Sequence, residues 1–135
     1  GMGAEIQLDQ IHGAAYPERM TSQTEMEHPW CVTQAKINEA IDRIVHVSAP
    51  RKIILFGSVA RGEAGPDSDV DMLVVQAHVP NRYAEIVRLT RCLRGLLLSV
   101  DLLVVGESEL DELKDVPGSV YRTALREGHV VYEAA

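Results

Sequence analysis

Two carboxylates and a glycine-serine pair stand beside two apolar segments near the middle of the chain. The apolar segment 53–56 leads into Gly57-Ser58, and Asp69 and Asp71 lead into the apolar segment 72–75. Because side chains alternate along a strand, Asp69 and Asp71 project from the same face. Magnesium bound to a phosphate chain takes carboxylate ligands of this kind. The spacing therefore indicates chemistry on a nucleotide.

The glycine-rich loop itself is compatible with phosphate binding. Gly57 allows a sharp turn, and backbone N–H groups together with the Ser58 hydroxyl can surround phosphate oxygens. A Walker A motif is excluded because Gly62 is followed by Glu63-Ala64 instead of Lys and Ser or Thr. A hydrolase nucleophile elbow, Gly-x-Ser-x-Gly, is absent. Taken alone, a Gly-Ser pair also fits an ordinary tight turn.

Asp101 supplies a third carboxylate within the apolar segment 97–105. A charge in such a strand is costly if it is buried without a partner. A metal ion shared with Asp69 and Asp71 would be such a partner and is favoured over the alternative, a salt bridge to Arg51. Three carboxylates beside a phosphate loop suit displacement at phosphorus by two metal ions. Asp69 and Asp71 would then bridge both ions, while Asp101 would hold one and help deprotonate the acceptor.

The hydrophobic pattern predicts the elements that position these residues. Helices are expected at 33–48, 82–95, 107–114 and 117–127, and strands at 51–57, 69–76, 97–105 and 129–132. The buried side of the second helix is predicted to be Tyr83, Ile86, Val87, Leu89 and Leu93. This order predicts one sheet with helices packed mainly on one face, in a domain at 31–135. Residues 1–30 are expected to be an extension, disordered or in contact with a partner.

Composition narrows the class of protein. A chain of 135 residues fits one domain, and its net charge of −7 disfavours nonspecific nucleic-acid binding. It has neither an apolar run near the roughly 18 residues of a membrane span nor a secretory signal, so we expect a cytoplasmic protein. Cys31 and Cys92 suit reduced thiols. A zinc site at His28 and Cys31 is disfavoured because a second ligand pair is missing.

The predicted helix 82–95 carries a basic surface in this acidic chain. Its arginines are Arg82, Arg88, Arg91 and Arg94. A solvated helix face is the ordinary explanation of such a charge pattern, and a docking face for a partner is the alternative.

The motifs in combination resemble a known superfamily. Gly57-Ser58, ten intervening residues, Asp69-Val70-Asp71 and the later Asp101 are similar to nucleotidyltransferases of the DNA polymerase β type. The segments 57–62 and 68–71 are most similar to the small members called minimal nucleotidyltransferases, which also end much as 124–132 does. The likeness covers about residues 33–133.

The resemblance implies an α+β palm domain with a mixed sheet that transfers a nucleoside monophosphate, expected to be AMP from ATP. It implies a two-metal Mg²⁺ site held by Asp69, Asp71 and Asp101, which are the expected catalytic residues. It assigns triphosphate binding to Gly57 and Ser58, with Arg61 as a further phosphate contact.

The resemblance also implies a partner. Larger relatives close the nucleotide cleft with a helical domain for which this chain has no room, so a partner protein or a second copy is expected to complete it. Minimal nucleotidyltransferases are often paired with a helical HEPN-domain protein as antitoxin and toxin, and adenylylation silences the toxin's RNase. The alternatives are transfer to a small aminoglycoside-like hydroxyl compound and an antitoxin that acts by binding without catalysis.

Overall fold

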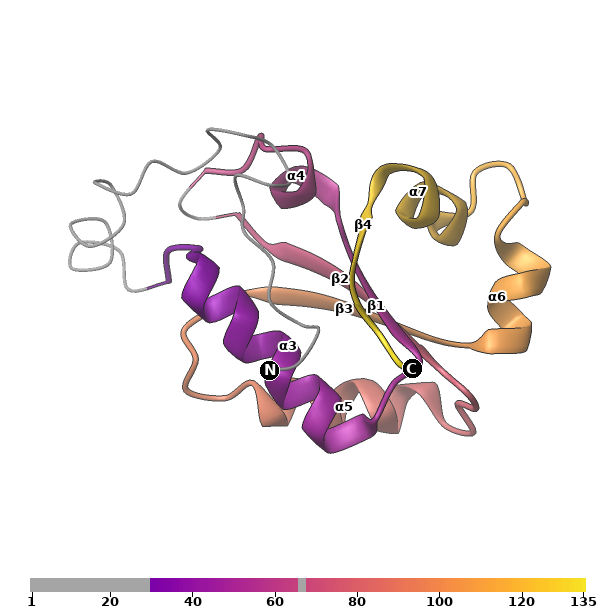
Figure 1. Cartoon of the computed structure of the whole chain (residues 1–135), viewed down its shortest axis with the longest axis horizontal. Coiled ribbons are helices and arrows are strands. Elements are labelled where there is room, and N and C mark those ends of the chain that lie inside the picture. The colour runs from indigo at the N-terminus through magenta and orange to yellow at the C-terminus, as the bar shows by residue number, and fades with distance from the viewer. Residues whose placement is uncertain (1–29, 66–67) are drawn as a thin grey trace.

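A computed structural model describes residues 30–65 and 68–135 of the chain. The elements are α3 (Gln34–Ser48), β1 (Lys52–Phe56), α4 (Gly57–Ala60), β2 (Val70–Gln76), α5 (Arg82–Cys92), β3 (Val100–Gly106), α6 (Glu107–Leu113), α7 (Val120–Glu127) and β4 (His129–Glu133). Figure 1 shows the strands crossing the middle of the molecule between two groups of helices. None of the helices in the described ranges has the length and apolarity required to span a bilayer.

The strands form one mixed sheet in the order β3-β2-β1-β4. β1 runs antiparallel to β2 and β4, whereas β2 and β3 are parallel and are joined through α5. A parallel pair needs such a crossover, because a tight turn cannot bring the chain back to the same end of the sheet. The predicted α+β class with a mixed sheet is confirmed.

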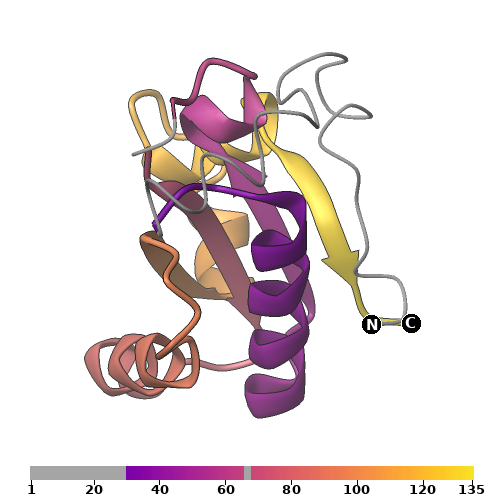
Figure 2. The ribbon, with the colours of Figure 1, turned by 90° about the vertical axis from the view of Figure 1, so that its left-hand side faces the viewer.

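The two faces of the sheet are covered to different extents. The larger core packs α3 and α5 against one face, with Ile37, Ile41 and Leu89 fully buried. A smaller core on the other face contains Leu110 of α6 and Ala124 of α7. In Figure 2, α3 lies nearest the viewer while α6 and α7 lie behind the strands. Helices therefore cover mainly one face, as predicted, and the structure adds a thinner layer on the other.

The segment between α5 and β3 differs from the prediction. The helix ends at Cys92 instead of residue 95, and the strand begins at Val100 instead of residue 97. Gly95 and Leu97 adopt left-handed backbone angles, with φ of 84° and 56°. Such residues end a helix and cannot continue a strand, so a turn separates the two elements.

The burial predicted for one side of α5 is confirmed in the C-terminal half of the helix. Leu89 and Leu93 are buried, and Ile86 and Val87 are half-buried. The burial predicted for Tyr83 was wrong, because 79% of this residue is exposed. The helix contacts the core through its later turns, and its first turn remains at the surface. The extension predicted at 1–30 lies outside the described residues apart from its last position, and so does His28 of the disfavoured zinc pair.

Gly128 joins α7 to β4 where two backbones approach closely. A Cβ atom there would overlap the carbonyl oxygen of Ala124 and would lie 2.7 Å from that of Leu55 and 2.8 Å from Cγ2 of Ile54. We expect Gly128→Ala to lower the free energy of unfolding by about 1–3 kcal/mol, because backbone atoms must move. Gly65→Ala is the control, since none of the described residues lies within 4 Å of its Cβ position. Urea denaturation measures both, and equal effects would contradict the packing argument.

Candidate active site

The site is built around the junction of β1 and α4. Gly57 follows the last residue of β1 and has a φ of 75°, a left-handed conformation that glycine adopts without steric cost. A side chain at this position would overlap Oδ2 of Asp71. The backbone of the loop therefore lies directly against that carboxylate, and only glycine permits this approach. Ser58 is half-buried in the next position, at the same end of β1.

The sheet register places two of the aspartates side by side. Asp71 is the register partner of Phe56 at the end of β1 and of Asp101 on β3. Asp69 lies immediately before β2, and its carboxylate accepts a hydrogen bond from the Ser99 hydroxyl. The backbone supports this arrangement, because the Val70 N–H donates to the Ser99 carbonyl at 2.8 Å.

The three carboxylates interact electrostatically. Burial raises the pKa of the Asp71 carboxyl, and the negative charges of Asp101 and Asp69 raise it further. Hydrogen bonding to the Asp101 side chain raises the pKa of Asp71 in the same direction. The positive charge of Arg61 lowers this pKa. Asp71 therefore stands where a positive ion would be most stabilising.

The chemistry of these ligands fits a hard divalent cation, which takes carboxylate oxygens. Asp69, Asp71 and Asp101 are the residues that would hold it. Within residues 30–65 and 68–135, no group of three His, Cys, Asp or Glu side chains is placed so that it could hold a metal ion. The backbone thus brings the aspartates to one end of β2 and β3, where Asp69 accepts a hydrogen bond from Ser99.

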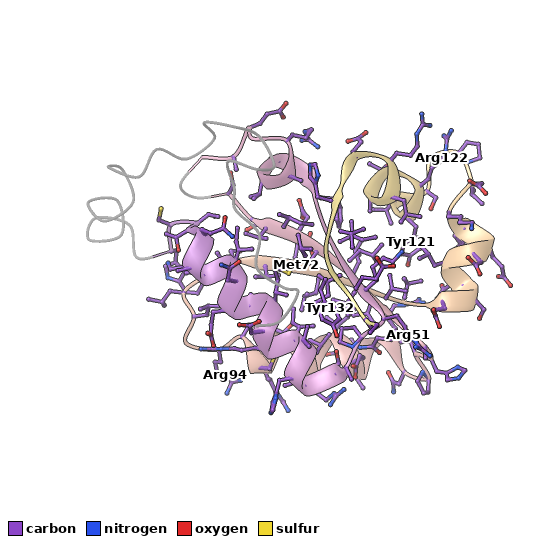
Figure 3. All side chains as sticks on the ribbon, in the orientation of Figure 1. Arg51, Met72, Arg94, Tyr121, Arg122 and Tyr132 are labelled. Atoms are coloured by element: carbon purple, nitrogen blue, oxygen red, sulfur yellow. The ribbon has the colours of Figure 1, made fainter. Side chains whose placement is uncertain are left out.

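Asp101 is exposed, so the cost of burying an unpaired charge does not apply to it. β3 is an edge strand, and its second residue is not covered by the helices. The alternative salt bridge to Arg51 is not formed. Arg51 precedes β1 and lies at the opposite end of that strand from Gly57, where it pairs with Glu107 at 3.5 Å (Figure 3).

Arg61 follows α4 and interacts with two acidic side chains. Its Nε lies 3.0 Å from Glu63, and its Nη1 lies 3.6 Å from Glu127 at the end of α7. Sequence reasoning missed both Glu127 and Ser99. Ser99 could have been found, because it stands two residues before Asp101, just as Asp69 stands two before Asp71.

The raised pKa of Asp71 has a measurable consequence for stability. Since the folded chain binds this proton more tightly than the unfolded chain, the stabilisation is fully present below 3.8, the ordinary pKa of an aspartate, and is lost as the pH rises through the folded pKa. We expect the free energy of unfolding of the wild type minus that of Asp71→Asn to fall as the pH rises from 3.8 through the folded pKa of Asp71. Above that pKa the difference should be constant. Thermal unfolding of both proteins across the acidic range measures this difference. A difference that increases with pH would contradict the electrostatic description.

Comparisons with known proteins agree with this geometry. A family model described as "Nucleotidyltransferase domain" matches residues 35–130. "Putative protein adenylyltransferase MJ0604" of Methanocaldococcus jannaschii is 38% identical over 84 residues, which are 61% of this chain and 78% of that protein. The crystal structure of a "putative nucleotidyltransferase" from Sulfolobus solfataricus aligns with a TM-score of 0.51 and 22% identity over 82% of this chain and 85% of that one, which shows a shared fold. The chain therefore belongs to the nucleotidyltransferase domain family and is a nucleotidyltransferase enzyme.

Proposed function

We propose that this enzyme transfers the nucleoside monophosphate of an NTP, ATP in the first instance, to a hydroxyl group of a protein. The observation that carries the proposal is the contact between the Gly57 backbone and the Asp71 carboxylate, with Asp101 in register beside it. In the proposed reaction, this contact would bring the loop that binds the triphosphate next to the carboxylates that bind the metal ion. The name of the Methanocaldococcus relative, a protein adenylyltransferase, supports AMP as the group and a protein as the acceptor.

Each group of site residues has its own role in the proposed reaction. Backbone N–H groups of the Gly57-Ser58 turn and the Ser58 hydroxyl donate to the triphosphate. Asp69, Asp71 and Asp101 would hold Mg²⁺, which when bound neutralises the triphosphate and stabilises the attacking and leaving oxygens. The acceptor oxygen forms a bond to the α-phosphorus, and the bond from that phosphorus to the β-phosphate oxygen breaks, which releases pyrophosphate. Asp101 accepts the acceptor's proton and passes it to water.

The exposure of the carboxylates favours a large acceptor. Asp69 and Asp101 are both exposed, so an acceptor hydroxyl can approach from solvent. A small acceptor is selected in an enclosed pocket that buries most of its surface. A protein acceptor instead brings its own surface to cover the site. The family resemblance also predicts a HEPN-domain partner, an antitoxin role and a second copy that completes the cleft. These remain predictions.

The acceptor class can be tested directly. We expect α-labelled ATP and Mg²⁺ to label the protein encoded by the adjacent gene, and an aminoglycoside to stay unlabelled. Label on the aminoglycoside alone would overturn the protein acceptor. If an Asp69→Ala/Asp71→Ala variant still neutralised the partner fully, binding without catalysis would replace the proposal.

Ser99 is expected to position Asp69. Removal of the hydroxyl in Ser99→Ala should lower the apparent Mg²⁺ affinity about 10–100-fold, the usual effect of losing a hydrogen bond to a metal ligand. Ser99→Thr keeps a hydroxyl and should stay within a few fold of the wild type. The readouts are the Mg²⁺ dependence of transfer and, without ATP, the binding of Mn²⁺ followed by electron paramagnetic resonance. Equal Mn²⁺ affinity in the wild type and Ser99→Ala would contradict this role.

A further inference from the structure

A groove lies on the face of the sheet opposite the aspartates, between the end of α5 and the edge strand β3. Its volume is about 310 Å³, and Trp30, Leu97, Val100 and Leu102 are among the residues that line it. Two of these apolar residues are also unusually accessible: Trp30 is 53% exposed and Leu97 is 41% exposed. Exposed apolar side chains that gather around a hollow mark a place where another molecule binds.

Hydrogen bonds from α3 hold the walls of this groove in place. The Lys36 ammonium donates to the carbonyl of Cys31, next to Trp30, and to the carbonyl of Leu97, both at 2.9 Å. Leu97 has a φ of 56°, a conformation that costs a leucine roughly 1 kcal/mol. Lys36 therefore joins the two exposed apolar residues and fixes Leu97 in a strained conformation. The groove is formed before any partner arrives.

The turn after α5 is fixed in the same way. Nη1 of Arg43 donates to the carbonyl of Cys92 at 3.3 Å and to that of Arg94 at 3.1 Å. These bonds hold the backbone of the turn to α3 and leave the Arg94 side chain exposed at the outside of the molecule (Figure 3).

The charge of the groove is positive. Four arginines make the α5 region basic. Arg82 forms an ion pair with Glu109 and Arg88 forms one with Glu85, so the charges of these two are balanced within the chain. Arg91 and Arg94 line the groove, and none of the described residues that line it is acidic. In a chain of net charge −7 this combination selects an anionic partner. The sequence suggested a docking face along the whole basic helix. In the part of the chain that the structure describes, the free arginines of that face are limited to the C-terminal end of α5.

The groove and the aspartates share one strand. Val100 and Leu102 line the groove, and Asp101 between them projects from the opposite face. A polypeptide that occupies the groove is therefore held at the edge of the sheet that also carries the catalytic carboxylates. Its neighbouring residues can pass around this edge toward the site.

We propose that this groove docks the protein acceptor through an acidic segment with a large apolar side chain. The apolar side chain would lie between Trp30 and Leu97, and carboxylates would pair with Arg91 and Arg94. The identity of the occupant as acceptor rests on the proposed function, whereas the binding itself needs neither ATP nor metal.

The chain offers an internal probe for this binding, because Trp30 is its only tryptophan. The ligand is a capped peptide in which Leu-Phe is flanked by glutamates, and the reference is the same peptide with lysines. We expect a saturable change in Trp30 emission with the glutamate peptide that weakens at least tenfold in Arg91→Glu/Arg94→Glu. Arg122→Glu/Arg126→Glu on α7 is the matched control and should bind as the wild type does. Leu97→Asn tests the apolar contact, since asparagine tolerates the left-handed backbone, and it should bind at least threefold more weakly.

Several outcomes would overturn the proposal. They are no saturable change with the glutamate peptide, an equal response to the lysine peptide, equal affinity in the two arginine double variants, and preferential binding of a thymidine oligonucleotide. Asp71→Asn separates this proposal from the proposed function. It should bind the peptide normally while transfer is lost, so a failure of the proposed function leaves peptide binding intact. Absence of peptide binding by a wild type that still transfers the label to protein would overturn the docking site alone.

Discussion

Asp71→Asn is expected to reduce nucleotidyl transfer about a thousandfold or more, the largest effect of any single substitution in this enzyme. The carboxylate of Asp71 lies against the Gly57 backbone and beside Asp101, so it contacts both the phosphate loop and the second strand of the site. Asparagine keeps the shape of the side chain but removes the charge that would hold a divalent cation. The measurement is the rate of transfer from α-labelled ATP at saturating Mg²⁺.

The control for this substitution is Asp115→Asn, an exposed aspartate in the turn between α6 and α7. It should transfer at the rate of the wild type. Circular dichroism should show that Asp71→Asn remains folded, because removing a repelled, half-buried charge does not weaken the fold. Transfer by Asp71→Asn within tenfold of the wild type would remove Asp71 from the catalytic machinery.

Gly57→Ala is expected to reduce transfer about a hundredfold, the cost of displacing a catalytic group by roughly 1 Å. The methyl group of alanine would overlap Oδ2 of Asp71, so either the carboxylate or the loop has to move. The left-handed φ of 75° adds backbone strain of roughly 1–2 kcal/mol. Both stability and transfer should fall, and they are measured by urea denaturation and by the same labelled-ATP assay.

Two other glycines separate the steric effect from the strain. Gly95 and Gly118 have φ of 84° and 82°, and no atom of residues 30–65 or 68–135 lies within 4 Å of a Cβ at either position. Gly118→Ala should therefore lose stability through strain alone and keep full transfer. Gly95→Ala should likewise lose stability through strain, but it is no control for transfer because Gly95 lines the proposed docking groove. If Gly118→Ala lost as much transfer as Gly57→Ala, backbone strain would explain the loss and the contact with Asp71 would not.

Much of the fold could be predicted because its signals are local. The helical spacing of Ile37, Ile41 and Ile44 specifies α3, and Thr33 caps it by accepting a hydrogen bond from the Lys36 N–H. The apolar segments of β1 and β2 are short and continuous, which is typical of strands covered on both faces. The family resemblance implied a mixed sheet, but neither it nor these local patterns specified that β2 and β3 pair in parallel.

The remaining features of the fold and of the site depend on tertiary contacts that a single sequence does not specify. The position of Asp101 on an edge strand leaves it exposed, although its apolar neighbours suggested burial. Arg82 and Arg88 look like free surface charges in the sequence, but Glu109 and Glu85 pair with them in the structure. The bond from Ser99 to Asp69 joins residues on neighbouring strands and becomes visible only when the register is known.

The position of the transferred label tests the proposed chemistry most directly. Extract of the source cell, freed of small molecules, is incubated with the enzyme, Mg²⁺ and ATP labelled either at the α- or at the γ-phosphorus. The wild type should place the α-label covalently on protein and release the γ-label in pyrophosphate, and Asp71→Asn should do neither. Protein labelled from the γ-phosphorus, equal α-labelling by Asp71→Asn, or no labelling above that of the extract alone would contradict nucleotidyl transfer to protein at this site.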